Sequence, residues 1–206
     1  LGGMITVSCL VVLILEIWRR RLTEFLDPVF TSSSKTLWLL VISSIVFARF
    51  YLAAGKINWA GDGSAHLAYV YVTSQAMARG ELPIWTNYLG LGSPYLQLYG
   101  FLFFYLVGAV DLLVDQVDIS LKVVMLFGHV LSGVGMFSWV CAATDSRRAG
   151  FVAGIAFVLG FWHTQQVLVM GRLPLSLFYG LAPWPFFFFE RSRRTSDRGP
   201  WMVLGG

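Results

Sequence analysis

The sequence predicts an all-α fold: a polytopic transmembrane helical bundle of about six spans, with an interfacial helix in the long loop after the second span. Of its 206 residues, 57% are hydrophobic and only 13% are charged, whereas soluble proteins are about 25% charged. The mean hydropathy is +0.70. The hydrophobic residues gather in runs that approach the roughly 20 residues needed to cross a bilayer. A water-soluble domain is therefore not expected.

The charged residues support the same class of protein. The net charge is +4, and the cations stand in short clusters between apolar runs. This distribution predicts topology signals and contacts with membrane lipid headgroups, and no nucleic-acid partner. Cys9 and Cys141 lie far apart within apolar runs. They are interpreted as small buried hydrophobic residues, so neither a disulfide nor a thiolate metal site is predicted.

Six apolar runs are candidate spans. The first is followed by Arg19, Arg20 and Arg21, a basic flank typical of a membrane anchor and not of a cleavable leader. The chain opens and closes on apolar stretches, so we expect residues 1–206 to be a single transmembrane domain taken from a longer chain. The candidate spans are residues 4–18, 36–54, 95–114, 119–143, 149–169 and 173–189.

Residues 55–94 form the long polar connection, where binding or catalytic residues are expected to lie. The basic cluster after the first span predicts a cytoplasmic first connection, which places residues 55–94 outside the cytoplasm. Strict alternation of six spans then also places the basic residues at 147–148 and 191–194 outside. The three basic clusters can all be cytoplasmic only if one apolar run does not cross the membrane. The sequence does not decide which run that is.

A helix over residues 64–78 is predicted inside this connection. Asp62 suits its N-cap, and Arg79 and Gly80 mark its end. At about 15 residues it is too short to cross comfortably, so we expect it to lie in the interface plane. Asp62 and His66 are four residues apart and therefore share one helix face.

The segments around this helix resemble the glycosyltransferase C superfamily, and in particular bacterial and archaeal membrane proteins described as related to pyruvoyl-tetrahydropterin synthase. The resemblance rests on the helix with histidine in its first turn and covers roughly residues 36–190. It implies a multi-pass protein of the cytoplasmic (inner) membrane. The segments that carry it are RGELPIW at 79–85, GLGSPY at 90–95, WHTQQ at 162–166 and GRLP at 171–174.

The resemblance implies sugar transfer from a polyprenyl-phosphate carrier at the outer membrane face. In that reaction Asp62 would be the general base, and His66 would orient it. Arg79 or Arg172 would bind the departing lipid phosphate. Glu81 is the nearest second carboxylate to Asp62, which argues against a divalent metal, and no metal site is predicted.

Simpler roles stand beside these. Asp62 can serve only as a helix cap, and Arg172 can be an interfacial anchor that reaches lipid headgroups. The favoured function is a non-catalytic or partial module acting as a transmembrane subunit of a larger membrane assembly with other membrane proteins. The alternative is a polyprenyl-phosphate-sugar-dependent glycosyltransferase, and the sequence identifies no cofactor.

His129 lies inside the fourth candidate span, where ionisable residues are costly and often functional. Small residues around it, including Gly128 and Gly133, predict a face for close helix packing. A histidine flanked by glycines could also ligate a pigment or haem, with His163 as a second ligand. A neutral His129 bonded to a neighbouring helix explains the residue equally well.

Overall fold

The computed structural model describes residues 16–17, 20–21, 24, 27–52, 62–87, 92–95 and 99–194. The chain divides into two compact units, Leu1–Leu39 and Leu40–Gly206. Most of the candidate span at 4–18, including Cys9, lies outside the described residues. In the first unit, Arg20 forms an ion pair with Glu16 at 3.0 Å.

The described chain is mostly helical, so the all-α prediction is confirmed. A two-residue ladder of β1 and β2 pairs Trp85 with Pro94 in antiparallel register. The elements are α2 (Ser33–Phe47), η1 (Arg49–Leu52), α3 (Gly63–Ala78), β1 (Trp85–Thr86), β2 (Ser93–Pro94), α4 (Phe101–Val114), α5 (Val117–Thr144), α6 (Arg147–Val158), α7 (Phe161–Thr164), the π-helix η2 (Gln165–Val169), α8 (Pro174–Leu181) and α9 (Pro183–Arg194).

Helix α5 is the centre of the larger unit, and α4, α6, α8 and α9 all pack against it. It has 28 residues and is the one helix within the described ranges that is both long and apolar enough to cross a membrane. The other candidate spans that the structure describes are divided or short. Helix α2 has 15 residues and α4 has 14, so the bundle of about six spans is not confirmed.

The interruptions follow from proline and glycine. The run at 149–169 breaks at Gly160, between α6 and α7, and ends in a π-helix. The run at 173–189 begins with Pro174 and is broken again at Pro183, the first residue of α9. Proline lacks the N–H that continues a helix, so it favours a helix start at these positions.

The small residues of α5 contact three different neighbours, so they do not form one packing face. A Cβ on Gly128 would lie 2.6 Å from the backbone oxygen of Ser176 in α8. Gly133 faces Val158 of α6, and Gly135 faces Trp184 of α9. The helical repeat of 3.6 residues turns these positions to different sides of α5, and each admits a closely packed neighbour.

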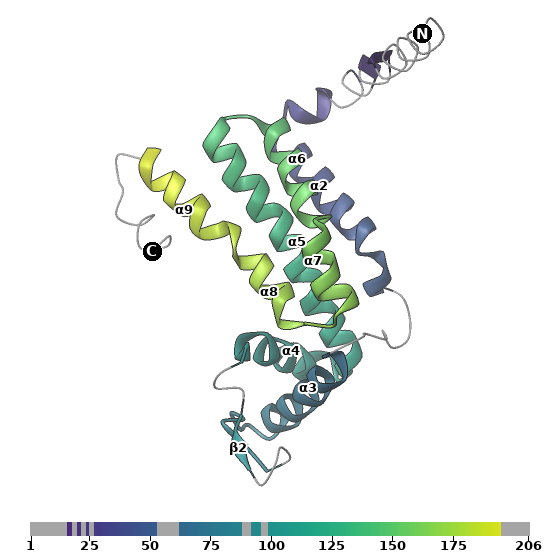
Figure 1. Ribbon diagram of the computed structural model, residues 1–206, viewed down its shortest axis with the longest axis vertical. Coiled ribbons are helices and arrows are strands. Elements are labelled where there is room, and N and C mark those ends of the chain that lie inside the picture. The colour runs from purple at the N-terminus through teal and green to yellow at the C-terminus, as the bar shows by residue number, and fades with distance from the viewer. Residues whose placement is uncertain are drawn as a thin grey trace, which may run out of the picture. The chain divides into compact units, whose positions relative to one another are not determined.

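The contacts also fix the direction of each helix. Gly150, near the start of α6, packs on Cys141, near the end of α5, so these two helices are antiparallel. Helices α8 and α9 follow one another along α5 in its own direction, as Figure 1 shows. The end of α5, the start of α6 and the end of α9 therefore lie together.

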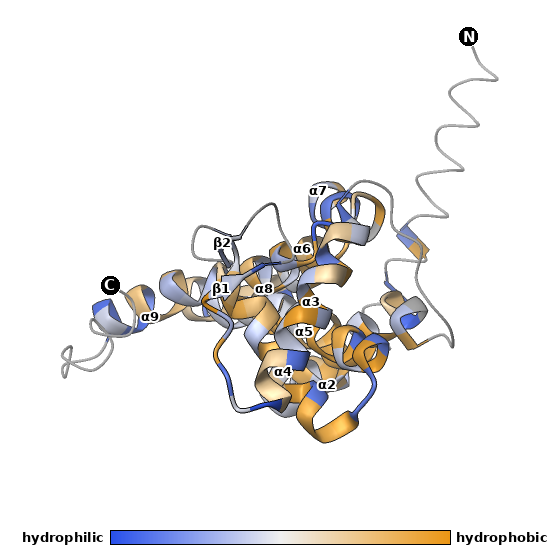
Figure 2. Ribbon diagram, turned by 90° about the horizontal axis from the view of Figure 1, so that it is seen from below, coloured by the Kyte–Doolittle hydropathy of each residue, from blue (hydrophilic) through white to orange (hydrophobic). Residues whose placement is uncertain are grey.

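Helices α3 and α4 pack on each other at the opposite end of this bundle, where α5 begins (Figure 1). Gly108 of α4 allows close contact with Thr73 and Met77 of α3. The predicted helix at 64–78 is confirmed as α3. It stops at Gly80, whose φ of +74° suits glycine. Hydrophobic residues are prominent on α4 and α5 when the molecule is viewed from this end (Figure 2).

Candidate functional site

Asp62 stands at the N-cap of α3, as predicted, but its side chain makes no capping hydrogen bond among the described residues. Its backbone is helical (φ −79°, ψ −4°), whereas capping residues usually have extended backbones that turn the side chain toward the first free N–H groups. The Asp62 N–H instead donates to the carbonyl of Met170 at 3.3 Å. The start of α3 is thereby attached to the turn after η2.

That turn, from Met170 to Leu173, carries Arg172. Gly171 adopts a φ of +66°, which allows the chain to reverse sharply after the π-helix. The Arg172 N–H then donates to the carbonyl of Gln166 at 3.0 Å. In the motif GRLP, Gly171 forms the turn, Arg172 follows it, and Pro174 begins α8.

His66 joins the two segments. Its Nδ1 lies 2.7 Å from the carbonyl oxygen of Gly171, and a carbonyl can only accept, so Nδ1 carries the proton. The Tyr99 hydroxyl then donates to Nε2, also at 2.7 Å. Both ring nitrogens are therefore used, and neither is bonded to the Asp62 carboxylate. The imidazole holds the turn that carries Arg172.

The environment of His66 favours its neutral form. Its side chain is only 1% exposed, and the Tyr99 ring stacks on it with ring centroids 5.6 Å apart. Burial lowers the pKa of His66, and the bond to Gly171 and the charge of Asp62 only partly oppose this. A neutral imidazole with one donor and one acceptor nitrogen matches the Gly171 carbonyl and the Tyr99 hydroxyl.

Asp62 and Arg172 face each other as an ion pair, with 3.7 Å between Oδ2 and Nε. Arg172 also donates from Nη1 to the Oε1 of Gln166 at 2.7 Å. Gln166 is buried, whereas the side chains of Arg172 and Asp62 are 46% and 56% exposed. The guanidinium is thus oriented by a buried amide while part of it stays accessible to a ligand.

A cleft of about 520 Å³ opens beside this pair. Its polar wall holds Asp62, Arg172 and Tyr99, and its remaining wall is apolar. A second, apolar groove of about 220 Å³ shares Gly100, Pro174 and Phe178 with the cleft. The groove is further lined by Phe101, Leu102, Phe103, Leu177 and Leu181. A charged cleft therefore continues into a hydrophobic groove between α4 and α8.

Three of the residues proposed from the sequence, Asp62, His66 and Arg172, are thus brought together. Arg79 is not. It lies at the other end of α3, where its guanidinium pairs with Glu81 at 3.0 Å. Sequence reasoning missed Tyr99 and Gln166. The Gln165–Gln166 pair inside an apolar run was the available signal for the second, whereas an aromatic run offers nothing that distinguishes Tyr99.

His129 and His163 form a separate, buried pair inside the bundle. Their side chains are 5% and 4% exposed, and their ring centroids are 5.4 Å apart. The glycines flanking His129 contact α8 and α6 directly. The space beside Gly128 and Gly133 is therefore filled by protein, and a flat macrocycle would have to displace one of these helices.

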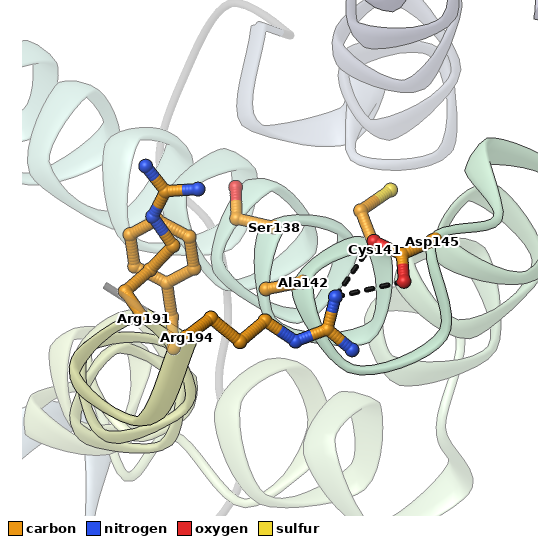
Figure 3. A pocket seen from close by; sticks show the side chains of 7 residues that line it. Ser138, Cys141, Ala142, Asp145, Arg191 and Arg194 are labelled. Carbon is orange, nitrogen blue, oxygen red and sulfur yellow. Dashed lines mark hydrogen bonds and ion pairs between the residues drawn. The ribbon is translucent and has the colours of Figure 1, made fainter. Parts of the chain in front are cut away.

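Another pocket, of about 300 Å³, lies at the opposite end of the bundle, between α5 and α9. Figure 3 shows Arg191 and Arg194 extending from α9 toward α5, with Arg194 bonded to Asp145. The guanidinium Nη1 of Arg194 lies 2.7 and 2.8 Å from the two Asp145 carboxylate oxygens, and Nη2 donates to the carbonyl of Ala143. This pair anchors the end of α9 to the end of α5.

Comparisons with known proteins found no match: neither protein-family models, nor curated proteins, nor solved structures resemble the chain closely enough to be significant.

Proposed function

We propose that this chain is a membrane module with a glycosyltransferase C-like fold that binds a polyprenyl-phosphate-linked ligand in the cleft beside Asp62 and Arg172. In this proposal it acts as a non-catalytic or partial subunit of a larger assembly in a bacterial or archaeal cytoplasmic membrane. One observation carries the proposal. A half-exposed arginine, oriented by a buried glutamine, stands where a charged cleft runs into an apolar groove.

The charged end of the cleft suits a phosphate. A guanidinium can present two parallel N–H donors to phosphate oxygens, and the side chain of Arg172 is only partly engaged by its long contact with Asp62. An exposed ion pair of this kind contributes little to stability, about 0–1 kcal/mol. Exchange of the Asp62 carboxylate for a ligand phosphate would therefore cost little.

The apolar groove suits an isoprenoid chain. Its lining includes the exposed side chains of Phe101, Leu102 and Phe178. Elsewhere in the larger unit, Leu113, Val152 and Phe161 are exposed at 88%, 64% and 77%. Large exposed apolar patches are rare on soluble monomers and are typical of surfaces that face lipid or a partner. We infer that the helices are solvated by a bilayer.

The helix directions support a membrane orientation in which the charge signals agree. If α4 lies at the membrane surface with α3 and does not cross, the segments of α2, α5, α6–η2 and α8–α9 alternate across the bilayer. The basic residues at 147–148 and 191–194 then fall on the cytoplasmic side with the first connection. The hydrophilic residues at the C-terminal end of α9 are visible in Figure 2. The cleft lies on the outer side.

Binding of a fluorescent polyprenyl phosphate to the protein in nanodiscs tests this function. Arg172→Gln should weaken binding about tenfold or more, because it removes the charged donor. Arg79→Gln is the matched variant, and we expect it to bind like the wild type because Arg79 pairs with Glu81 away from the cleft. Equal affinities for the wild type and Arg172→Gln would contradict the proposal.

Catalysis is the second candidate, because the Asp62 carboxylate lines the cleft and is not used as a helix cap. Loss of a general base slows a reaction by roughly a hundredfold or more. We expect no sugar transfer from a polyprenyl-phosphate sugar by the 206-residue chain. Measurable transfer that is abolished by Asp62→Asn, but not by Glu81→Gln, would establish the enzyme in place of the non-catalytic module.

A further inference from the structure

The buried histidine pair lies away from the cleft and has no part in the function proposed above. His129 belongs to the middle of α5, and His163 to α7, directly before the π-helix η2. π-helical turns are rare and occur frequently at functional sites. A buried ionisable residue at the depth of a membrane helix is also expensive to keep, which makes a binding role the first hypothesis to consider.

Each imidazole offers an unused nitrogen. The Nε2 atoms of His129 and His163 are both buried, and within the described part of the chain neither has a hydrogen-bond partner. The Nδ1 of His163 lies 3.3 Å from the carbonyl of Phe157 and must donate to it, so its Nε2 carries a lone pair. Buried polar atoms without a partner are uncommon in folded proteins, and a bound ion is one way to satisfy them.

The spacing of the two rings suits a single small ion. Bonds from imidazole nitrogen to a metal are about 2.0–2.1 Å long, so two rings that share one ion have centroids about 3 Å from it. Two rings that both direct Nε2 at one ion, with centroids 5.4 Å apart, would subtend an angle of about 120° at that ion. That geometry leaves one further position for a small ligand.

The surroundings select the kind of ion. Tyr179 stacks on His163 with centroids 4.5 Å apart, and Tyr51 meets His129 edge-on at 6.4 Å. No group of three or more His, Cys, Asp or Glu side chains occurs among the described residues, so none of the described carboxylates or thiolates joins the pair. A divalent ion would remain uncompensated in this apolar setting. A monovalent ion costs less to bury, and imidazole is a good ligand for copper.

We propose that His129 and His163 form a buried copper(I) site, with their Nε2 atoms as the two protein ligands. The ion satisfies both unpartnered nitrogens and joins α5 to α7. The site is separate from the Asp62–Arg172 cleft and shares no residue with it. It also differs from a haem or pigment site, because the small residues beside His129 are covered by α8 and α6.

Anaerobic titration of the purified full chain with copper(I), against a chromophoric chelator, tests the site. Cys9→Ser/Cys141→Ser is the background, because thiolates bind copper(I) themselves. We expect one equivalent of copper, lost in His129→Asn and in His163→Asn. The chain has three histidines, so His66→Gln is the matched control and should keep the equivalent.

X-ray absorption of the copper-loaded background protein gives a readout that does not depend on how the variants fold. We expect a nitrogen shell with the scattering pattern of two imidazoles. No bound equivalent, a bound ion retained in both histidine variants, a site that takes zinc(II) in preference, or a spectrum without two imidazoles would each overturn the copper(I) assignment.

Discussion

His66 donates from Nδ1 to the backbone carbonyl of Gly171 at 2.7 Å, across a sequence separation of 105 residues. The same ring accepts the Tyr99 hydroxyl, so one buried side chain connects α3, the approach to α4 and the turn before α8. Because Arg172 directly follows Gly171, the position of its guanidinium depends on this bond. His66 is therefore a positioning residue for the cleft.

The pH dependence of stability should reveal this role. The pKa of His66 is lowered from 6.5, so the unfolded chain binds this proton more readily than the folded protein. Its contribution is complete above about pH 6.5 and is lost as the pH falls toward the folded pKa. We expect the thermal midpoint in detergent to decrease from about pH 8 to about pH 5, and less so in His66→Gln.

The comparison with His66→Gln matters because other ionisable groups also affect stability over this pH range. Their contribution is common to both proteins, so the difference between the two pH profiles isolates His66. If the thermal midpoint falls equally with pH in the wild type and in His66→Gln, the bond to Gly171 does not stabilise the neutral form of His66.

Gln166→Leu should weaken binding of a polyprenyl phosphate without removing any charge. The amide accepts from Arg172 at 2.7 Å, and a hydrogen bond to a charged group is worth about 1.5–3 kcal/mol, so a loss of roughly tenfold in affinity is expected. Binding in nanodiscs measures the effect. Gln165→Leu, one position away in η2, is the control, and an equal loss in both variants would point to a general disturbance of the π-helix.

Gly128→Ala should destabilise the bundle. The added Cβ would lie 2.6 Å from the oxygen and 2.9 Å from the carbon of the Ser176 carbonyl group, so backbone would have to move. Overpacking costs about 1–3 kcal/mol, which outweighs the gain of about 1 kcal/mol in helix propensity. Thermal unfolding in detergent should show a lower midpoint.

Val123→Ala provides the comparison on the same helix. Val123 is exposed, so its truncation should change the free energy of unfolding by no more than about 0.5 kcal/mol. A Gly128→Ala protein as stable as the wild type would mean that α5 and α8 are not held at this close approach.

The orientation predicts opposite labelling of the two ends. In a cysteine-free background, Glu81→Cys should react with a membrane-impermeant thiol reagent in intact cells. Arg193→Cys, at the end of α9, should react only after permeabilisation. Labelling of both sites in intact cells would place the cleft and the basic end on the same side and remove α5 as a membrane crossing.

The sequence by itself determined the helical class, because apolar runs and few charges leave little choice of secondary structure in a bilayer-like solvent. It also determined the bounds of α3, because Asp62 and Gly80 mark the start and the end of this helix in the local sequence. Asp62, His66 and Arg172 could be selected as a candidate site, since each stands at a break between apolar runs.

Only the tertiary structure decided how these parts combine. Whether Asp62 caps its helix or faces Arg172, and which arginine joins the cleft, depends on contacts between residues distant in sequence. The way in which α6 to η2 and α8 to α9 run along α5 follows from packing around that helix, which a hydropathy pattern does not contain. The pairing of His129 with His163 has the same cause: periodicity places each residue on its own helix, and the folded bundle brings the two rings together.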